Sequence, residues 1–159
     1  MTLLLRILLL CAMAWPSLAS EQSDIQQLYR RGLQGDEDAV NLCIEKLEGV
    51  LAREPQNQLA RVYLGSSYTL RSRDLGFGPK KLSALKHGLA LMDEAVSAAP
   101  NEPKVRLARA LTTSALPSFF GRKSESKSDF DLLREVAAQH PEKFDPADLQ
   151  ALREKTTVK

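Results

Sequence analysis

Three prolines, Pro55, Pro100 and Pro141, each follow an apolar-periodic segment of this 159-residue chain, at intervals of 45 and 41 residues. Proline removes a backbone donor and clashes with the turn before it, so a helix ends ahead of it. The segments before these prolines carry apolar residues three and four positions apart, which is the period of one helix face. No stretch of the sequence shows convincing strand alternation. The chain is therefore predicted to be all-α, with helices that recur in pairs.

Seven helices are expected from the apolar stripes and from the capping residues between them. The first is predicted to begin at a capping box of Ser23 and Gln26 and to stop at Gly35. The third is apolar on most sides, so we expect it to be central. Helix start signals such as Asx residues and N-terminal prolines place the other beginnings near Asp36, Asn57, Gly78, Asn101, Ser124 and Asp145.

The N-terminal segment has the layout of a secretory signal peptide. One basic residue, Arg6, precedes a short apolar run, and small residues stand at the end of the segment. We predict a signal peptide over residues 1–19, cleaved after Ala19, with an uncleaved anchor as the alternative. The mature protein is then exported to the periplasm or secreted, with no membrane span. Cleavage leaves Cys43 as a lone cysteine, which we expect to be a buried apolar residue rather than a nucleophile.

Two groups of residues in the middle of the chain form a known pattern. Residues 64–68 read Leu-Gly-Ser-Ser-Tyr, and Gly88, Met92, Ala95 and Pro100 follow at intervals of four, three and five. This pattern resembles the tetratricopeptide repeat, in which a small residue and an aromatic on one helix receive residues from the next. The resemblance covers most of residues 24–141. It implies antiparallel helix pairs stacked as a short solenoid over residues 20–144, about three pairs, with a C-terminal capping helix and tail over residues 145–159.

The resemblance also implies a function. Such stacks are non-enzymatic interaction modules that hold a protein or peptide partner in a concave groove lined by the first helix of each pair. With only two or three repeats, self-association is a further expectation. Helical phase then selects the groove residues, which are Asn57, Val62, Ser66, Thr69 and Arg73 in the second unit and Asn101, Lys104 and Leu111 in the third.

The chain departs from this family in the length of two connectors. A standard unit has ~34 residues, and the excess lies between the helices of the second and third pairs. Both connectors contain Phe-Gly-x-Lys, at residues 77–80 and 120–123. The two turns are predicted to project from the same edge, as matching structural corners or as one shared basic-aromatic rim. Phe77 is expected to pack onto neighbouring helices.

Cations in these connectors suggest an alternative function. Lys80, Lys81, Arg122 and Lys123 could bind a small anionic ligand or polymer, although a solvated helix surface accounts for the same charges. The glycines do not form a phosphate loop, because the spacing of G-x-x-x-x-G-K-[ST] is absent.

Other chemistries have little support in the sequence. His87 and His140 are the only histidines and lack ligand spacing, so no metal and no cofactor is expected. No carboxylate pair or G-x-S-x-G motif stands out, and no catalytic residue is predicted. A cryptic helical hydrolase remains the least favoured alternative. Nucleic acid is a poor partner for an exported protein.

Overall fold

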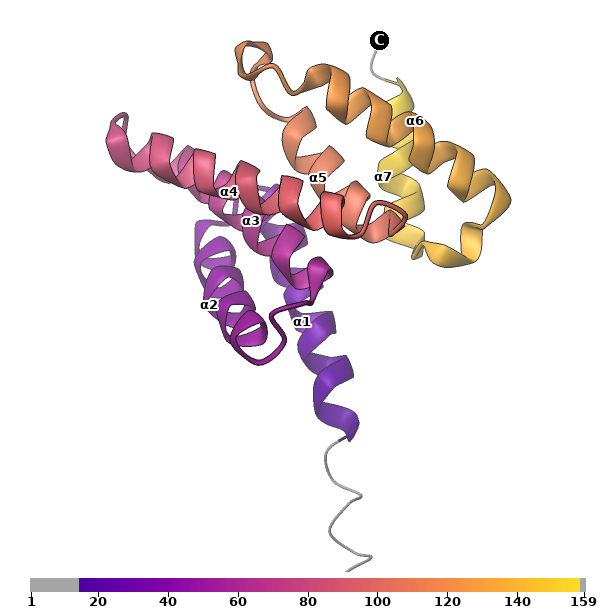
Figure 1. Cartoon of the computed structure of the whole chain (residues 1–159), viewed down its shortest axis with the longest axis horizontal. Helices are drawn as coiled ribbons and strands as arrows, with labels where there is room; N and C mark the ends of the chain where they lie inside the picture. The colour runs from indigo at the N-terminus through magenta and orange to yellow at the C-terminus, as the bar shows by residue number, and fades with distance from the viewer. Residues whose placement is uncertain (1–14, 158–159) are drawn as a thin grey trace, which may run out of the picture.

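The computed structural model describes residues 15–157, and this part of the chain contains seven α-helices, two short 3-10 helices and no strand. The all-α prediction is therefore confirmed (Figure 1). The elements in chain order are α1 (Trp15–Leu33), α2 (Glu37–Arg53), α3 (Gln58–Asp74), α4 (Pro79–Ala98), α5 (Pro103–Ser114), η1 (Ser118–Phe120), α6 (Lys123–Gln139), η2 (Pro141–Lys143) and α7 (Pro146–Thr157).

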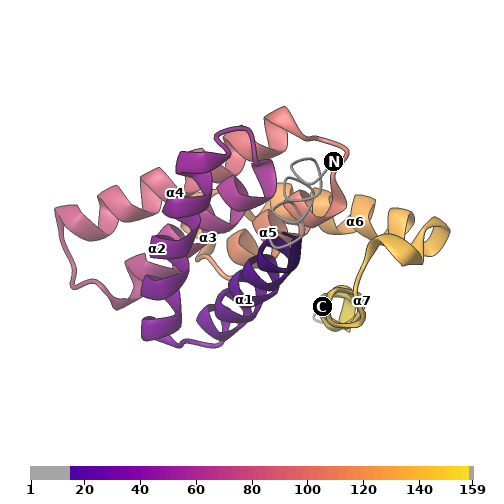
Figure 2. The ribbon, with the colours of Figure 1, turned by 90° about the horizontal axis from the view of Figure 1, so that it is seen from below.

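Helix α3 lies at the centre, as its apolar sequence predicts. It packs most extensively against α4 and also contacts α2, α5 and α1. Helices α1 and α2 pack together, as do α5 and α6, so each even-numbered helix of the first six contacts the helix before it. Helix α7 lies across α1 from α2 and is seen end-on in Figure 2.

Gly65 and Gly88, two residues of the repeat pattern, meet where α3 crosses α4. A Cβ atom added to Gly65 would lie 2.6 Å from the carbonyl oxygen of Gly88 and 2.9 Å from Cγ of Met92. Real Cβ atoms do not approach other atoms so closely, so the two backbones are in direct contact at this point. Glycine at both positions is what allows these helices to pack at this distance.

The buried side chains form two clusters. The larger lies among the first five helices and includes Val40, Leu47, Val62 and Met92, all at most 1% exposed. The smaller joins α5 and α6 to the C-terminal segment, where Leu152 is 3% exposed. Cys43 is fully buried in the larger cluster, as predicted.

Two of the predicted helix caps are confirmed. The side chain of Asp36 accepts a hydrogen bond from Ala39 N at 2.9 Å, and Asn57 accepts one from Ala60 N at 2.9 Å. The capping box at Ser23 is wrong, because α1 begins at Trp15 and Ser23 lies inside it.

Only the last residues of the predicted signal peptide belong to the part of the chain that the structure describes. Residues 1–14 lie outside the described residues, and the predicted cleavage position after Ala19 falls within α1. Across residues 15–157 the structure contains no helix with the length and hydropathy needed to cross a bilayer.

Candidate functional site

The two lengthened connectors lie at one edge of the molecule and together line a single cleft of about 800 Å³. We call it the connector cleft. It lies between the start of α4 and the segment that joins α5 to α6, and these two segments extend along the upper edge in Figure 1. Its lining residues are Ser72, Arg73, Phe77, Gly78, Pro79, Lys81, Leu82, Leu85, Leu116, Pro117, Phe119 and Phe120. The Phe-Gly-x-Lys turns thus form one shared rim.

Aromatic side chains on this rim face solvent. Phe77 is fully exposed and Phe119 is 80% exposed, so the expectation that Phe77 packs onto neighbouring helices is wrong. Gly78, the next residue, has a φ of 151°, a value that side-chain-bearing residues rarely adopt, so the connector follows a path that glycine permits. Phe77 is left outside the packed helices along this path. Gly121 ends η1 with a φ of 71° and makes the corresponding turn in the second connector.

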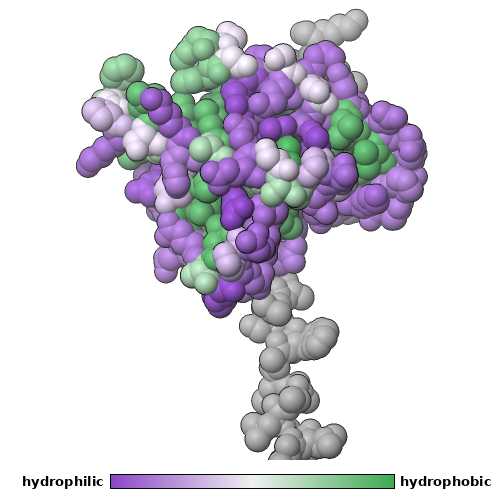
Figure 3. Space-filling model, in the orientation of Figure 1, coloured by the Kyte–Doolittle hydropathy of each residue, from purple (hydrophilic) through white to green (hydrophobic). Residues whose placement is uncertain are grey.

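The connector cleft is mainly apolar. Leu82 lines it and is 49% exposed, and the rings of Phe119 and Phe120 pack with centroids 4.3 Å apart. Figure 3 shows hydrophobic surface gathered in green along this upper edge. Contiguous exposed apolar surface on a soluble domain usually marks an interaction site.

The four predicted rim cations do not act together. Arg122 pairs with Asp93 and with Glu125 Oε1 at 3.0 Å, and the Nζ atom of Lys123 donates to the carbonyl oxygen of Ser114 at 2.6 Å. Both side chains therefore hold the second connector in place. Lys81 lines the connector cleft, whereas Lys80 lines an adjacent shallow hollow.

An ion-pair network holds the second connector to the helices beside it. Asp129 on α6 is 1% exposed and accepts from Arg106 Nη1 at 2.6 Å and from Arg109 Nε at 2.8 Å. Arg109 also lies 3.3 Å from Glu125, which in turn pairs with Arg122. Burial raises the pKa of the Glu125 carboxyl, and its two arginine neighbours only partly oppose this. The network links α4, α5 and α6 just below the aromatic rim.

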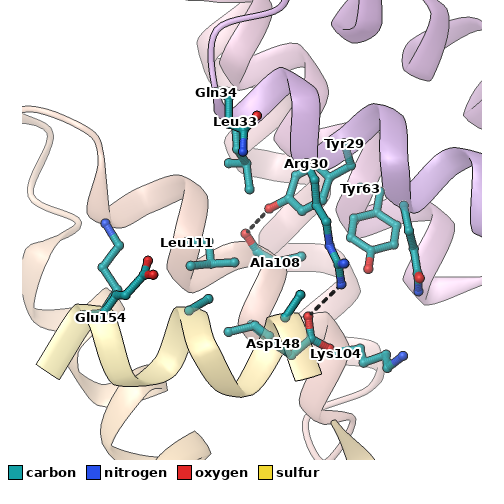
Figure 4. Close-up of a pocket in the computed structure, with 15 residues that line it drawn as sticks. Tyr29, Arg30, Leu33, Gln34, Tyr63, Lys104, Ala108, Leu111, Asp148 and Glu154 are labelled. Carbon is teal, nitrogen blue, oxygen red and sulfur yellow. Dashed lines mark hydrogen bonds and ion pairs between the residues drawn. The ribbon is translucent and has the colours of Figure 1, made fainter. Parts of the chain in front are cut away.

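A second, smaller cleft of about 270 Å³ lies among α1, α3, α5 and α7 (Figure 4). The guanidinium of Arg30 reaches across it to Asp145 at 2.8 Å and to Asp148 at 3.4 Å. The hydroxyl of Tyr29 donates to the carbonyl oxygen of Ala108 at 3.2 Å, and burial raises the pKa of Tyr29 to about 12. Helix α7 therefore covers the side that α1, α3 and α5 would otherwise present to a partner.

The predicted groove residues do not share one surface. Lys104 and Leu111 line the smaller cleft, whereas Arg73 lines the connector cleft. Asn57 caps α3, and Asn101 is exposed beside the start of α5.

Three of these predicted residues are buried. Val62, Ser66 and Thr69 are 0–2% exposed, and Ser66 accepts a hydrogen bond from Thr112 on α5 at 2.8 Å. A partner could contact them only if the helices separated, so the structure corrects their assignment to the groove. The cause is that α4 and α5 both pack directly on the face of α3 assigned to the partner.

Comparisons with family models, with curated proteins and with solved structures give no match for this chain. Within residues 15–157, no group of three or more metal-ligating side chains comes together. Phe120 belongs to the repeated Phe-Gly-x-Lys turn that the sequence analysis identified. Leu116 and Phe119 were missed because they lie outside the main helices, where helical phase gives no signal.

Proposed function

We propose that this chain is a non-enzymatic protein-interaction module of the tetratricopeptide-like type, acting in the periplasm or outside the cell, and that its partner binds the connector cleft. The observation that carries the proposal is that two connectors, far apart in sequence, converge on one apolar cleft, with Phe77 fully exposed and Phe119 80% exposed at its rim. Keeping Phe77 in water forgoes the burial of a large apolar side chain, which is worth roughly 2–3 kcal/mol. A partner that covers the rim recovers this free energy.

A partner protein fits the connector cleft better than a small anion does. Arg122 and Lys123 are engaged within the fold, so they cannot converge on an anion at the rim without breaking those contacts. Apolar volume of about 800 Å³ suits inserted hydrophobic side chains. The smaller cleft is a weaker candidate, because α7 already occupies much of it.

A site-specific photo-crosslinker tests this proposal. Benzoylphenylalanine is placed at Phe77 or Phe119 in the full chain, and in matched controls at Leu42 or Leu132, which are exposed apolar residues elsewhere. Irradiation in the producing cells should give a discrete protein adduct from the two rim positions and none from the controls. Equal adducts at all four positions, or none at the rim, would refute a partner at the connector cleft.

A further inference from the structure

The cations at the connector cleft have no carboxylate partner. Several arginines of the described residues do pair with carboxylates, as Arg30, Arg53 and Arg109 do. Around the cleft, Lys80 and Lys81 form no ion pair within the described residues. The positive charge at this edge is therefore not neutralised by the fold.

Arg73 contributes a further cation that no carboxylate neutralises. Its guanidinium donates to the carbonyl oxygens of Gly32 at 2.7 Å and Leu70 at 3.2 Å. Both contacts are to backbone oxygens, so no carboxylate neutralises the charge of this exposed side chain. No acidic side chain is among the residues that line the cleft.

We infer that the partner segment held by the connector cleft is an amphipathic acidic peptide, with apolar side chains that enter the cleft and carboxylates that flank them. This inference rests on the proposed function and names the chemistry of the partner. The apolar side chains fill the space between Phe77 and Phe119, and the carboxylates face Lys81 and Arg73, which line the cleft, with Lys80 in the hollow beside it. Charge complementarity of this kind selects a partner and speeds its association.

The shape of the site favours a peptide over an anionic membrane. A bilayer surface is flat on this scale and would touch the tips of Phe77 and Phe119 while leaving the cleft between them empty. A helix or extended segment presents a ridge of side chains that can enter the hollow. Apolar anchors in a groove are the usual mode of peptide recognition by helical folds.

Selection from a random dodecapeptide display library on the immobilised full chain tests this inference. Enriched peptides should combine Leu, Ile, Phe or Trp with neighbouring Asp or Glu. A Phe77→Ser/Phe119→Ser variant should bind a selected peptide about thirtyfold more weakly, because it removes two exposed anchors. The matched Leu42→Ser/Leu132→Ser variant, altered at exposed apolar sites outside the cleft, should bind it unchanged.

Charge reversal separates this inference from the proposed function. Repeating the selection on a Lys80→Glu/Lys81→Glu variant should enrich Lys or Arg beside the same apolar residues, and peptides from the first selection should bind about tenfold more weakly. Apolar peptides without a charge preference on either protein would overturn the inference and leave the proposed function intact. If no peptide is selected, or if phosphatidylglycerol vesicles bind through Phe77 instead, both are overturned.

Discussion

Replacing Gly65 by alanine should destabilise the fold, although alanine is the better helix former. Gly→Ala inside a helix ordinarily gains about 1 kcal/mol. At Gly65 the new Cβ would lie 2.6 Å from the backbone oxygen of Gly88 and 2.9 Å from the backbone nitrogen of Met92. Backbone atoms cannot rotate away, so α3 and α4 must separate. Overpacking typically costs about 1–3 kcal/mol, and contact with backbone places Gly65→Ala near 3 kcal/mol. The net loss is then about 2 kcal/mol.

Gly49 provides the matched control. It lies inside α2, and a Cβ there meets only Nη1 of Arg53 at 3.7 Å, which is the mobile end of a flexible side chain. Gly49→Ala should therefore raise the free energy of unfolding by about 0.5–1 kcal/mol.

Thermal unfolding followed by circular dichroism measures both effects. A loss of about 2 kcal/mol corresponds to a fall in Tm of roughly 4–8 °C for a domain of this size, whereas Gly49→Ala should raise Tm by about 2–3 °C. Gly88→Ala should resemble Gly65→Ala, and the double variant should lose less than the sum, because the helices have already separated. A Gly65→Ala protein that melts at or above the parent temperature would refute the close crossing.

Three further predictions concern buried polar and ionisable groups. Asp129→Asn should lower the free energy of unfolding by about 3 kcal/mol in urea titrations, because the two arginines that pair with it lose their charged partner; a loss below 1 kcal/mol would contradict a structural role. Burial raises the pKa of the Cys43 thiol, so this thiol should react slowly with a disulfide reagent at pH 8. In a Cys11→Ser variant, where Cys43 is the only thiol, it should resist the reagent in the folded protein and react fully in urea. Rapid reaction of the folded protein would contradict the burial of Cys43. The pKa of Tyr29 is raised from 10 to about 12, so between these pH values the folded state keeps a proton that the unfolded state loses. The contribution of Tyr29 to stability is therefore fully present below pH 10 and is lost between pH 10 and about 12. Because the pKa values of Tyr63 and Tyr68 are raised as well, absorbance of tyrosinate at 295 nm should show no tyrosine of the folded protein titrating at its ordinary pKa.

Much of the helical architecture could be predicted because its signals are local. Asp36 and Asn57 accept hydrogen bonds from backbone amides three residues ahead, and their sequence context is enough to place them. The start of α1 was misplaced at Ser23 because a good capping residue can equally lie inside a helix, exposed to solvent. Only the continuation of the helix back to Trp15 distinguishes the two cases.

The candidate site was harder to predict because it depends on how the helices pack against one another, which local sequence signals do not give. Helical phase correctly grouped Val62, Ser66 and Thr69 on one face of α3, but α5 and α4 cover that face. The repeated Phe-Gly-x-Lys turns indicated a common edge. Their glycines could not indicate that Phe77 stays in solvent, since the exposure of a connector side chain depends on which helices pack against it.

The contact between α7 and α1 has a consequence for how the chain unfolds. In an open stack each unit touches only its neighbours, so the two ends fray independently. Here Arg30 and Asp145, 115 residues apart in sequence, hold the last helix against the first. Detaching either terminal helix therefore weakens the hold on the other, and we expect hydrogen exchange in α1 and α7 to speed up together. Helix α1 therefore gains its full set of contacts only when α7 has docked.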